Sequence, residues 1–89
     1  MSHWYSGTTT QRSIAANTTV VIECCTIPST DTAPLILVVN MILGGGTNSS
    51  AAVLTGFYSS NRKVYAKVRN VWNAAAQVTV SYGIETLWI

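Results

Sequence analysis

Residues 63–71 read KVYAKVRNV, and this stretch decides the fold class because two kinds of residue alternate along it. Every second position holds a small or branched apolar residue: Val64, Ala66 and Val68. The other side of the stretch carries Tyr65, Lys67 and Arg69. A period of two is the geometry of a β-strand, in which successive side chains point to opposite faces of the sheet. The stretch therefore predicts a strand with one buried face and one exposed face.

The same rhythm extends outward from residues 63–71, and no stretch of ten or more residues has the apolar spacing of a helix. Turn-forming residues separate the predicted strands. We expect these strands at residues 8–14, 18–25, 35–43, 51–59, 63–71 and 77–89. Residues 1–7 are expected to form a frayed N-terminal segment. The prediction is one all-β domain over residues 1–89, a small antiparallel β-sandwich of jelly-roll type with about six strands.

The strand expected at residues 35–43 is apolar on both sides, although a two-layer sandwich buries only one face of each sheet. The uncovered side would carry Ile36, Val38 and Ile42. The whole chain is 48% hydrophobic and only 9% charged, against about 25% charged in ordinary domains. We therefore predict a homo-oligomer whose interface includes these three residues. A lysine at Val38 is expected to dissociate it or prevent folding, whereas a lysine at Thr79 should be mild.

Few residues suited to catalysis or metal binding occur in this chain. Its acidic residues lie far apart in the sequence: Glu23, Asp31 and Glu85. The one histidine, His3, falls in the segment expected to fray. The adjacent Cys24 and Cys25 would point to opposite faces of a strand, and they lack the paired spacing of a zinc site. We predict a protein that is not an enzyme and uses no metal and no cofactor.

The charge pattern and the apolar runs bear on possible partners. A net charge of +2 is small for a nucleic-acid-binding domain. Four cations lie within residues 62–69, but only two or three of them can share one strand face. The longest apolar run, residues 34–43, is about half of what a membrane-spanning helix needs. Residues 1–7 lack the features of a secretory signal. We expect no nucleic-acid partner, no membrane insertion and synthesis in the cytoplasm.

Trp72 is the strongest candidate for contact with a ligand, because it falls at a predicted hairpin tip between Asn70 and Asn73. Sugar rings pack on Trp and Tyr rings, while amide and guanidinium groups hydrogen-bond to their hydroxyls. Arg69 and Tyr65 on the preceding strand supply such groups. These five residues form the predicted ligand site. The alternative is that Trp72 packs against a neighbouring subunit.

Several stretches from residue 51 onward resemble the small tip domains of bacteriophage tail fibres and receptor-binding proteins. The stretches are Phe57-Tyr58 with Ser59-Ser60, the alternating residues 64–70, the small-residue turn 73–76, and QVTVSY at 77–82. The Thr-rich residues 13–19 are similar to the opening of such a domain. Two features depart from the family pattern: the sequence starts at Met1 without a fibre stalk, and a double cysteine is unusual in these tips.

This resemblance implies a trimeric β-sandwich, related in style to the H-type lectins, at the distal end of a fibre. Such a virion protein would recognise a bacterial surface glycan or protein and would contact other virion proteins. The alternative function is purely structural. In that case the chain would be a capsid decoration or head-fibre protein that cements neighbouring subunits and has no free ligand site.

Overall fold

The computed structural model describes residues 2–31 and 36–87, and for residues 2 and 36–38 it describes the backbone alone. Within these ranges the chain forms seven β-strands and no helix. The strands are β1 (Ser2–Thr8), β2 (Arg12–Ile14), β3 (Thr19–Thr26), β4 (Ile36–Leu43), β5 (Ala52–Ser60), β6 (Lys63–Asn70) and β7 (Ala76–Leu87). The predicted all-β class is confirmed.

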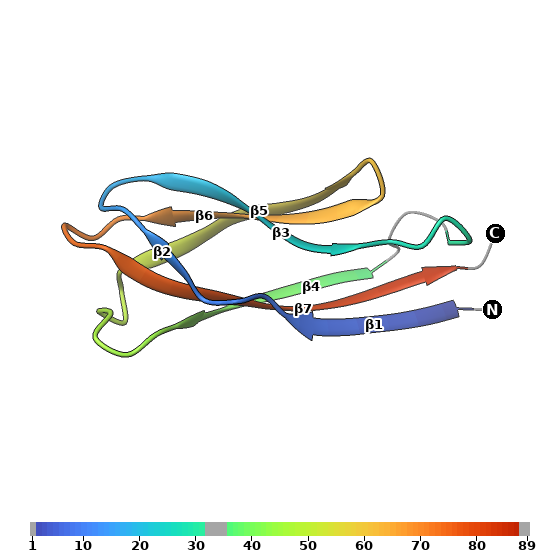
Figure 1. Cartoon of the computed structure of the whole chain (residues 1–89), viewed down its shortest axis with the longest axis horizontal. Coiled ribbons are helices and arrows are strands. Elements are labelled where there is room, and N and C mark those ends of the chain that lie inside the picture. Colours follow the sequence, from blue (N-terminus) through green and yellow to red (C-terminus); the bar gives the residue numbers. More distant parts are fainter. Residues whose placement is uncertain (1, 32–35, 88–89) are drawn as a thin grey trace.

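The strands form two antiparallel sheets, which lie as two layers (Figure 1). In the first, called sheet A, β7 is the central strand, and its Tyr82 pairs with Val39 of β4 on one side and with Gly7 of β1 on the other. Strand β2 continues along the same edge as β1. In the second, called sheet B, β6 lies between β3 and β5. The predicted antiparallel sandwich is confirmed.

The core lies between the sheets, where the inward residues of the two central strands meet. Val64, Ala66 and Val68 of β6 are fully buried, as the alternation predicts. The inward residues of β7 are fully buried as well: Ala76, Val78, Val80 and Ile84. Each buried Val or Ile side chain contributes roughly 1.5–3 kcal/mol. The period-two pattern of the central strands therefore supplies most of the core.

The N-terminal residues differ from the expected frayed segment, because residues 2–8 form β1 and pair with β7 along their whole length. The strand expected at residues 8–14 is correspondingly divided, since β1 ends at Thr8 and β2 begins at Arg12. The positions of β1 that share a face with the buried residues of β7 hold His3, Tyr5 and Gly7. None of them is aliphatic, so hydropathy alternation does not reveal this strand.

A bulge in β3 between Glu23 and Cys25 corrects the expectation for the two cysteines. The additional residue, Cys24, interrupts the alternation, so successive side chains there no longer point to opposite faces. Cys24 and Cys25 both pack against buried residues of the core, and both are free thiols.

The molecule is elongated, with extents of 45 × 20 × 16 Å, because the strands run along its long axis (Figure 1). We call the end of the molecule where β1 begins and β7 ends the terminal end. At the other, which we call the hairpin end, β6 is connected to β7. The candidate sites lie at both ends and on the outer faces of the sheets.

Candidate functional site

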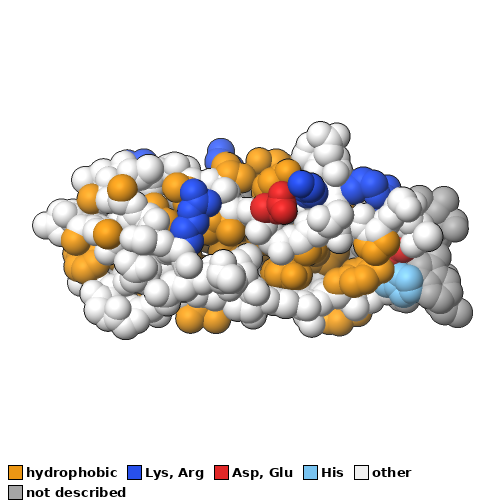
Figure 2. Space-filling model, in the orientation of Figure 1, with side chains coloured by type: hydrophobic (Ala, Val, Ile, Leu, Met, Phe, Trp, Pro, Cys, Tyr) orange, Lys and Arg blue, Asp and Glu red, His pale blue; other side chains and the backbone are white. Residues whose placement is uncertain are grey.

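The outer face of sheet B brings together two of the five residues predicted to contact a ligand. Tyr65 and Arg69 both lie on β6 with Lys67 between them, and the three alternate with the buried residues of that strand. Tyr65 stacks on Tyr58 of β5, with ring centroids 5.2 Å apart and ring planes at 27°. In Figure 2 most Lys and Arg side chains lie over the upper layer, which is sheet B. We call Tyr58, Tyr65, Lys67 and Arg69 the sheet B patch.

Some of the charges on this outer face are already paired. Lys63 Nζ lies 3.1 Å from Glu23 Oε1, and this hydrogen bond raises the pKa of Lys63. Arg69 Nη1 donates to Thr19 Oγ1 over 3.1 Å, which leaves its charge unneutralised. Lys67 has no ion-pair partner among the described residues. Lys67 and Arg69 therefore supply the unpaired positive charge of the sheet B patch.

Arg62 is not part of this face, although it is adjacent to Lys63 in the sequence. It occupies the β5–β6 turn with a φ of 62°. Its guanidinium donates to three backbone carbonyl oxygens, those of Ile27, Pro28 and Asp31. Its charge thus holds the segment after β3, and no more than three of the four neighbouring cations share a face.

Asn70 is removed from the predicted ligand site, because its side chain is fully buried. Its Nδ2 donates to the carbonyl oxygens of Ile14 at 2.9 Å, Ala15 at 3.2 Å and Ala74 at 2.8 Å. Its Oδ1 accepts the backbone N–H of Trp72 at 2.8 Å. Every polar atom of this amide is engaged within the chain, so Asn70 stabilises the hairpin end and presents nothing to a ligand.

Trp72 is half-buried and packs against the core of its own chain, whereas the sequence predicts an exposed ring at a hairpin tip. The neighbouring Asn73 is exposed. Tyr65 lies seven residues before Trp72. Within β6, Tyr65 and Arg69 are four residues apart, which in an extended strand is about 13 Å. The predicted residues thus divide into a pair on the outer face of sheet B, with Arg69 exposed and Tyr65 half-buried, an exposed amide at the hairpin end, and two residues that belong to the fold.

The outer face of sheet A carries one described residue of the predicted interface, Ile42, whose side chain is 51% exposed. The backbone register places Ile36 and Val38 on the same face, but their side chains lie outside the described residues. Trp4 of β1 is 58% exposed on this face. Its ring covers Gly83, where a Cβ atom would come within 2.5 Å of the indole. Leu87 of β7 lies on the same face and is 39% exposed, so Ile42, Trp4 and Leu87 all face solvent on sheet A.

A cluster at the terminal end was not found by sequence reasoning, because its members are distant in the chain. Asp31 is fully buried, and its Oδ2 accepts hydrogen bonds from Thr86 Oγ1 at 2.6 Å and Tyr5 Oη at 2.7 Å. The same oxygen lies 2.9 Å from His3 Nδ1. Thr30 Oγ1 donates to Oδ1 at 2.8 Å. We call these five residues the Asp31 clamp, since they tie β1 and β7 to the segment after β3.

The clamp determines the charge states of its members. Burial by itself would raise the pKa of Asp31, but the hydrogen bonds from the surrounding side chains outweigh it and hold that pKa well below its ordinary value. The carboxylate in turn raises the pKa of Tyr5, because the phenol donates to it and ionisation would place two negative charges together. His3, set aside on sequence grounds as part of a frayed terminus, is held in this cluster. The arrangement fastens three segments together.

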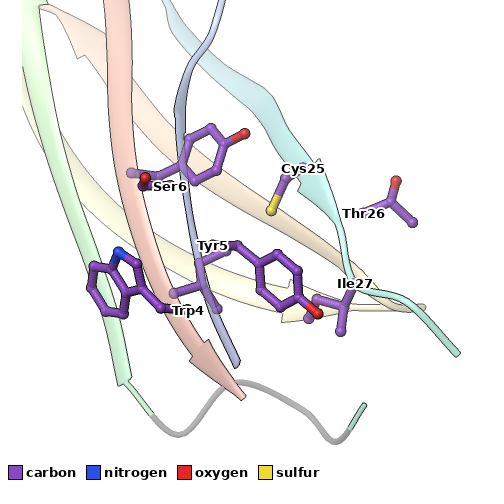
Figure 3. Close-up of a pocket in the computed structure, with 8 residues that line it drawn as sticks. Trp4, Tyr5, Ser6, Cys25, Thr26 and Ile27 are labelled. Carbon is purple, nitrogen blue, oxygen red and sulfur yellow. The ribbon is translucent and has the colours of Figure 1, made fainter. Parts of the chain in front are cut away.

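A pocket of about 410 Å³ opens between β1 of sheet A and β3 of sheet B (Figure 3). Eight residues line it: Trp4, Tyr5, Ser6, Cys25, Thr26, Ile27, Tyr82 and Ile84. Burial raises the pKa of Cys24 to about 11 and also raises that of Cys25. Both thiols are therefore protonated near neutral pH, and a protonated thiol is a poor nucleophile. The pocket is suited to binding.

Within the described residues, no group of three or more His, Cys, Asp and Glu side chains is arranged to hold a metal ion. No helix in that part of the chain is long and apolar enough to cross a membrane. Comparisons with protein-family models, with curated proteins and with solved structures found no match to this chain.

Proposed function

We propose that this chain is a non-enzymatic receptor-binding domain of a bacteriophage virion, and that it recognises an acidic glycan of the bacterial surface through the sheet B patch. The observation that carries the proposal is the stacked pair of the exposed Tyr58 and the half-buried Tyr65, on the same face as the unpaired charges of Lys67 and Arg69. The resemblance of residues 51–82 to tail-fibre tip domains supports the same function. Trp72 and Asn70 are no longer part of the proposed contact.

The chemistry of the patch fits a sugar that carries carboxylate or phosphate groups. The apolar C–H face of a sugar ring packs on an aromatic ring. A guanidinium binds an anionic group through two parallel hydrogen bonds, and an ammonium adds a compact positive charge. A single patch of this size binds weakly, but several copies in a symmetric virion protein bind a repeating surface glycan with much higher avidity.

Substituting Lys67 tests this function against a matched control on the same face. We expect Lys67→Ala to weaken binding to acidic bacterial glycans on an array by roughly 5- to 10-fold at low ionic strength, because it removes an unpaired cation. Tyr65→Ala is expected to weaken binding at least as much, because it removes a stacking ring. Lys63→Ala should have little effect, since Glu23 already neutralises Lys63.

The expected salt dependence gives a second readout, because binding by Lys67 and Arg69 should weaken as ionic strength rises. Equal binding by the Lys67→Ala and Lys63→Ala variants would remove the patch from the proposal. Absence of binding to any bacterial glycan or to host cells at high protein concentration would contradict receptor recognition itself.

A second candidate function, structural cementing of neighbouring subunits, is favoured by the exposure of Ile42 and Trp4 on sheet A. Burying such side chains against a copy of the chain contributes roughly 1.5–3 kcal/mol each. The two functions are compatible, because the patch lies on sheet B and the apolar side chains lie on sheet A. A trimer is the oligomer that the tip-domain resemblance implies, and we propose it for this chain.

We expect Ile42→Lys to dissociate the oligomer without unfolding the subunit, because Ile42 is exposed in the single chain and needed only between chains. Val53→Lys is the matched control, since Val53 is 47% exposed on an edge strand of sheet B. Light scattering measures both masses.

Thr79 pairs directly with Ile42 on the same face of sheet A. A lysine at Thr79 should therefore also disturb the interface, which changes the earlier expectation of a mild effect. A wild-type monomer at micromolar concentration would contradict this assembly.

A further inference from the structure

The pocket between β1 and β3 opens to solvent at an edge of the sandwich, where the space between the two sheets is not closed. Towards the hairpin end, the same space is closed by fully buried side chains: Ile14, Val68, Ala76 and Val78. A volume of about 410 Å³ in an 89-residue chain is within the range of small-molecule sites. The pocket is therefore large enough for a small-molecule ligand.

Two tyrosine rings contribute to the pocket from neighbouring strands. Figure 3 shows the Tyr5 ring directed towards Cys25 of β3 and Ile27, which follows β3, whereas Trp4 extends to the other side of β1. Tyr82 packs with Ile27 in the adjoining core cluster and lies against Gly7, where a Cβ atom would come within 2.5 Å of its hydroxyl. Glycine at position 7 is therefore required for the Tyr82 ring to lie across β1. The pocket has aromatic surfaces set in place by the fold.

The Asp31 clamp holds one of these rings in position before any ligand arrives. Tyr5 Oη donates to Asp31 Oδ2 over 2.7 Å, and that carboxylate is itself fixed by three further side chains. A ring anchored at its far end loses little freedom when a ligand stacks on it. Preorganisation of this kind favours binding, and it links the clamp to the pocket.

The chemical character of the lining selects the ligand class. None of the eight lining residues is charged, so an ionic ligand would lose its hydration without gaining a partner. Tyr5 already donates its hydroxyl to Asp31, so the hydroxyls left in the lining are those of Ser6, Thr26 and Tyr82. A sugar ring carries hydroxyls all around its edge, and those that face the apolar walls formed by Ile27 and Ile84 would lose their hydration without gaining a partner. An aromatic ring needs apolar walls and stacking surfaces, and the pocket offers both.

We propose that the pocket between β1 and β3 binds a neutral aromatic small molecule, stacked on Tyr5 and Tyr82 and packed against Ile27, Ile84 and Cys25. This site is separate from the sheet B patch. Loss of glycan binding and loss of aromatic binding are therefore independent results, and the failure of one proposal leaves the other standing.

Titration with 2-naphthol, followed by NMR of isoleucine methyl groups, tests the site in the wild-type chain. The methyl signals of Ile27 and Ile84 should shift with a Kd below about 1 mM, while those of Ile22, in the other core cluster, stay in place. 2-Naphthoate has the same rings and a negative charge, and should bind at least 10-fold more weakly. N-acetylglucosamine should leave these methyl signals unchanged.

Cys25→Phe fills the pocket with a ring of the protein's own and should weaken 2-naphthol binding at least 10-fold. Val21→Phe is the matched control, since it adds the same ring on the exposed outer face of sheet B and should leave affinity unchanged. Tyr82→Leu removes one stacking ring and should also weaken binding, which keeps the test decisive if Cys25→Phe fails to fold.

Three results would overturn the proposal. One is the absence of methyl shifts at Ile27 and Ile84 in the wild-type chain when the 2-naphthol concentration is at least 5-fold above the expected Kd. Another is unchanged affinity in the folded Cys25→Phe or Tyr82→Leu variants. The third is binding of N-acetylglucosamine or 2-naphthoate in place of 2-naphthol, because the lining would then not select a neutral aromatic ring.

Discussion

Replacing Asn70 with alanine should lower the free energy of unfolding by about 3 kcal/mol, because it removes a fully buried side chain and four hydrogen bonds, one of them buried and three part-buried. The carbonyl oxygens of Ile14, Ala15 and Ala74 each lose a donor. The N–H of Trp72 loses its acceptor. Urea denaturation monitored by circular dichroism measures the change. The expected loss is large because one amide connects three separate pieces of the hairpin end.

Asn73→Ala is the matched control, since Asn73 lies three residues further along and is exposed. Its effect on the free energy of unfolding should stay within about 0.5 kcal/mol. A comparable stability in the Asn70→Ala and Asn73→Ala variants would show that the buried amide is not the anchor described above. If Asn70→Ala also weakens receptor binding, the lost stability accounts for it, because the Asn70 side chain does not face a ligand.

The second large effect is the stability that the Asp31 clamp contributes to the folded chain, and we expect it to depend on pH. Because the folded-state pKa of Asp31 is depressed, the folded chain binds this proton less readily than the unfolded chain. The resulting stability is fully present above the unfolded pKa of about 4 and declines as the pH falls below it towards the folded pKa. Asp31→Asn should be less stable than the wild type at pH 7, and the difference should shrink in acid.

Thr86→Val isolates one hydrogen bond of the clamp while keeping the shape of the side chain. It should lower the melting temperature at pH 7 by roughly 10 °C, because a buried carboxylate loses a donor. Thr10→Val, at an exposed loop position, is the control and should be nearly neutral. Thermal melts between pH 2 and pH 7 measure both effects. A wild-type stability that is flat with pH below pH 4 would contradict the ionised, hydrogen-bonded state of Asp31.

Local pattern was sufficient to predict much of this fold. The alternation around Val64, Ala66 and Val68 predicted their burial, and the structure confirms it. The two apolar sides of the strand at residues 35–43 placed Ile42 on an uncovered face, and the structure exposes it. Both inferences rest on the strand period, which acts over neighbouring residues only and needs no knowledge of the rest of the chain.

The same local reasoning failed where a side chain is held by distant partners. Asn70 and Asn73 have similar surroundings in the sequence, yet one is fully buried and the other is exposed. The strand at residues 2–8 was missed because its inward positions carry no aliphatic side chain. Cys24 and Cys25 are free thiols, but the expectation that they point to opposite faces was wrong, because a bulge brings Cys25 to the core side as well. None of these features leaves a periodic signal.

By itself the sequence determined the all-β class, the antiparallel sandwich and the inward residues of β6 and β7, because burying one face of a strand imposes a repeat of two on the residues. Only the tertiary structure decided that Asn70 is an anchor, that Tyr58 stacks on Tyr65, and that Asp31 collects donors from positions 3, 5, 30 and 86. A buried polar group must be satisfied by hydrogen-bond partners, and those partners come from whichever strands the fold brings close. Their distance in the chain hides them from any reading of neighbouring residues.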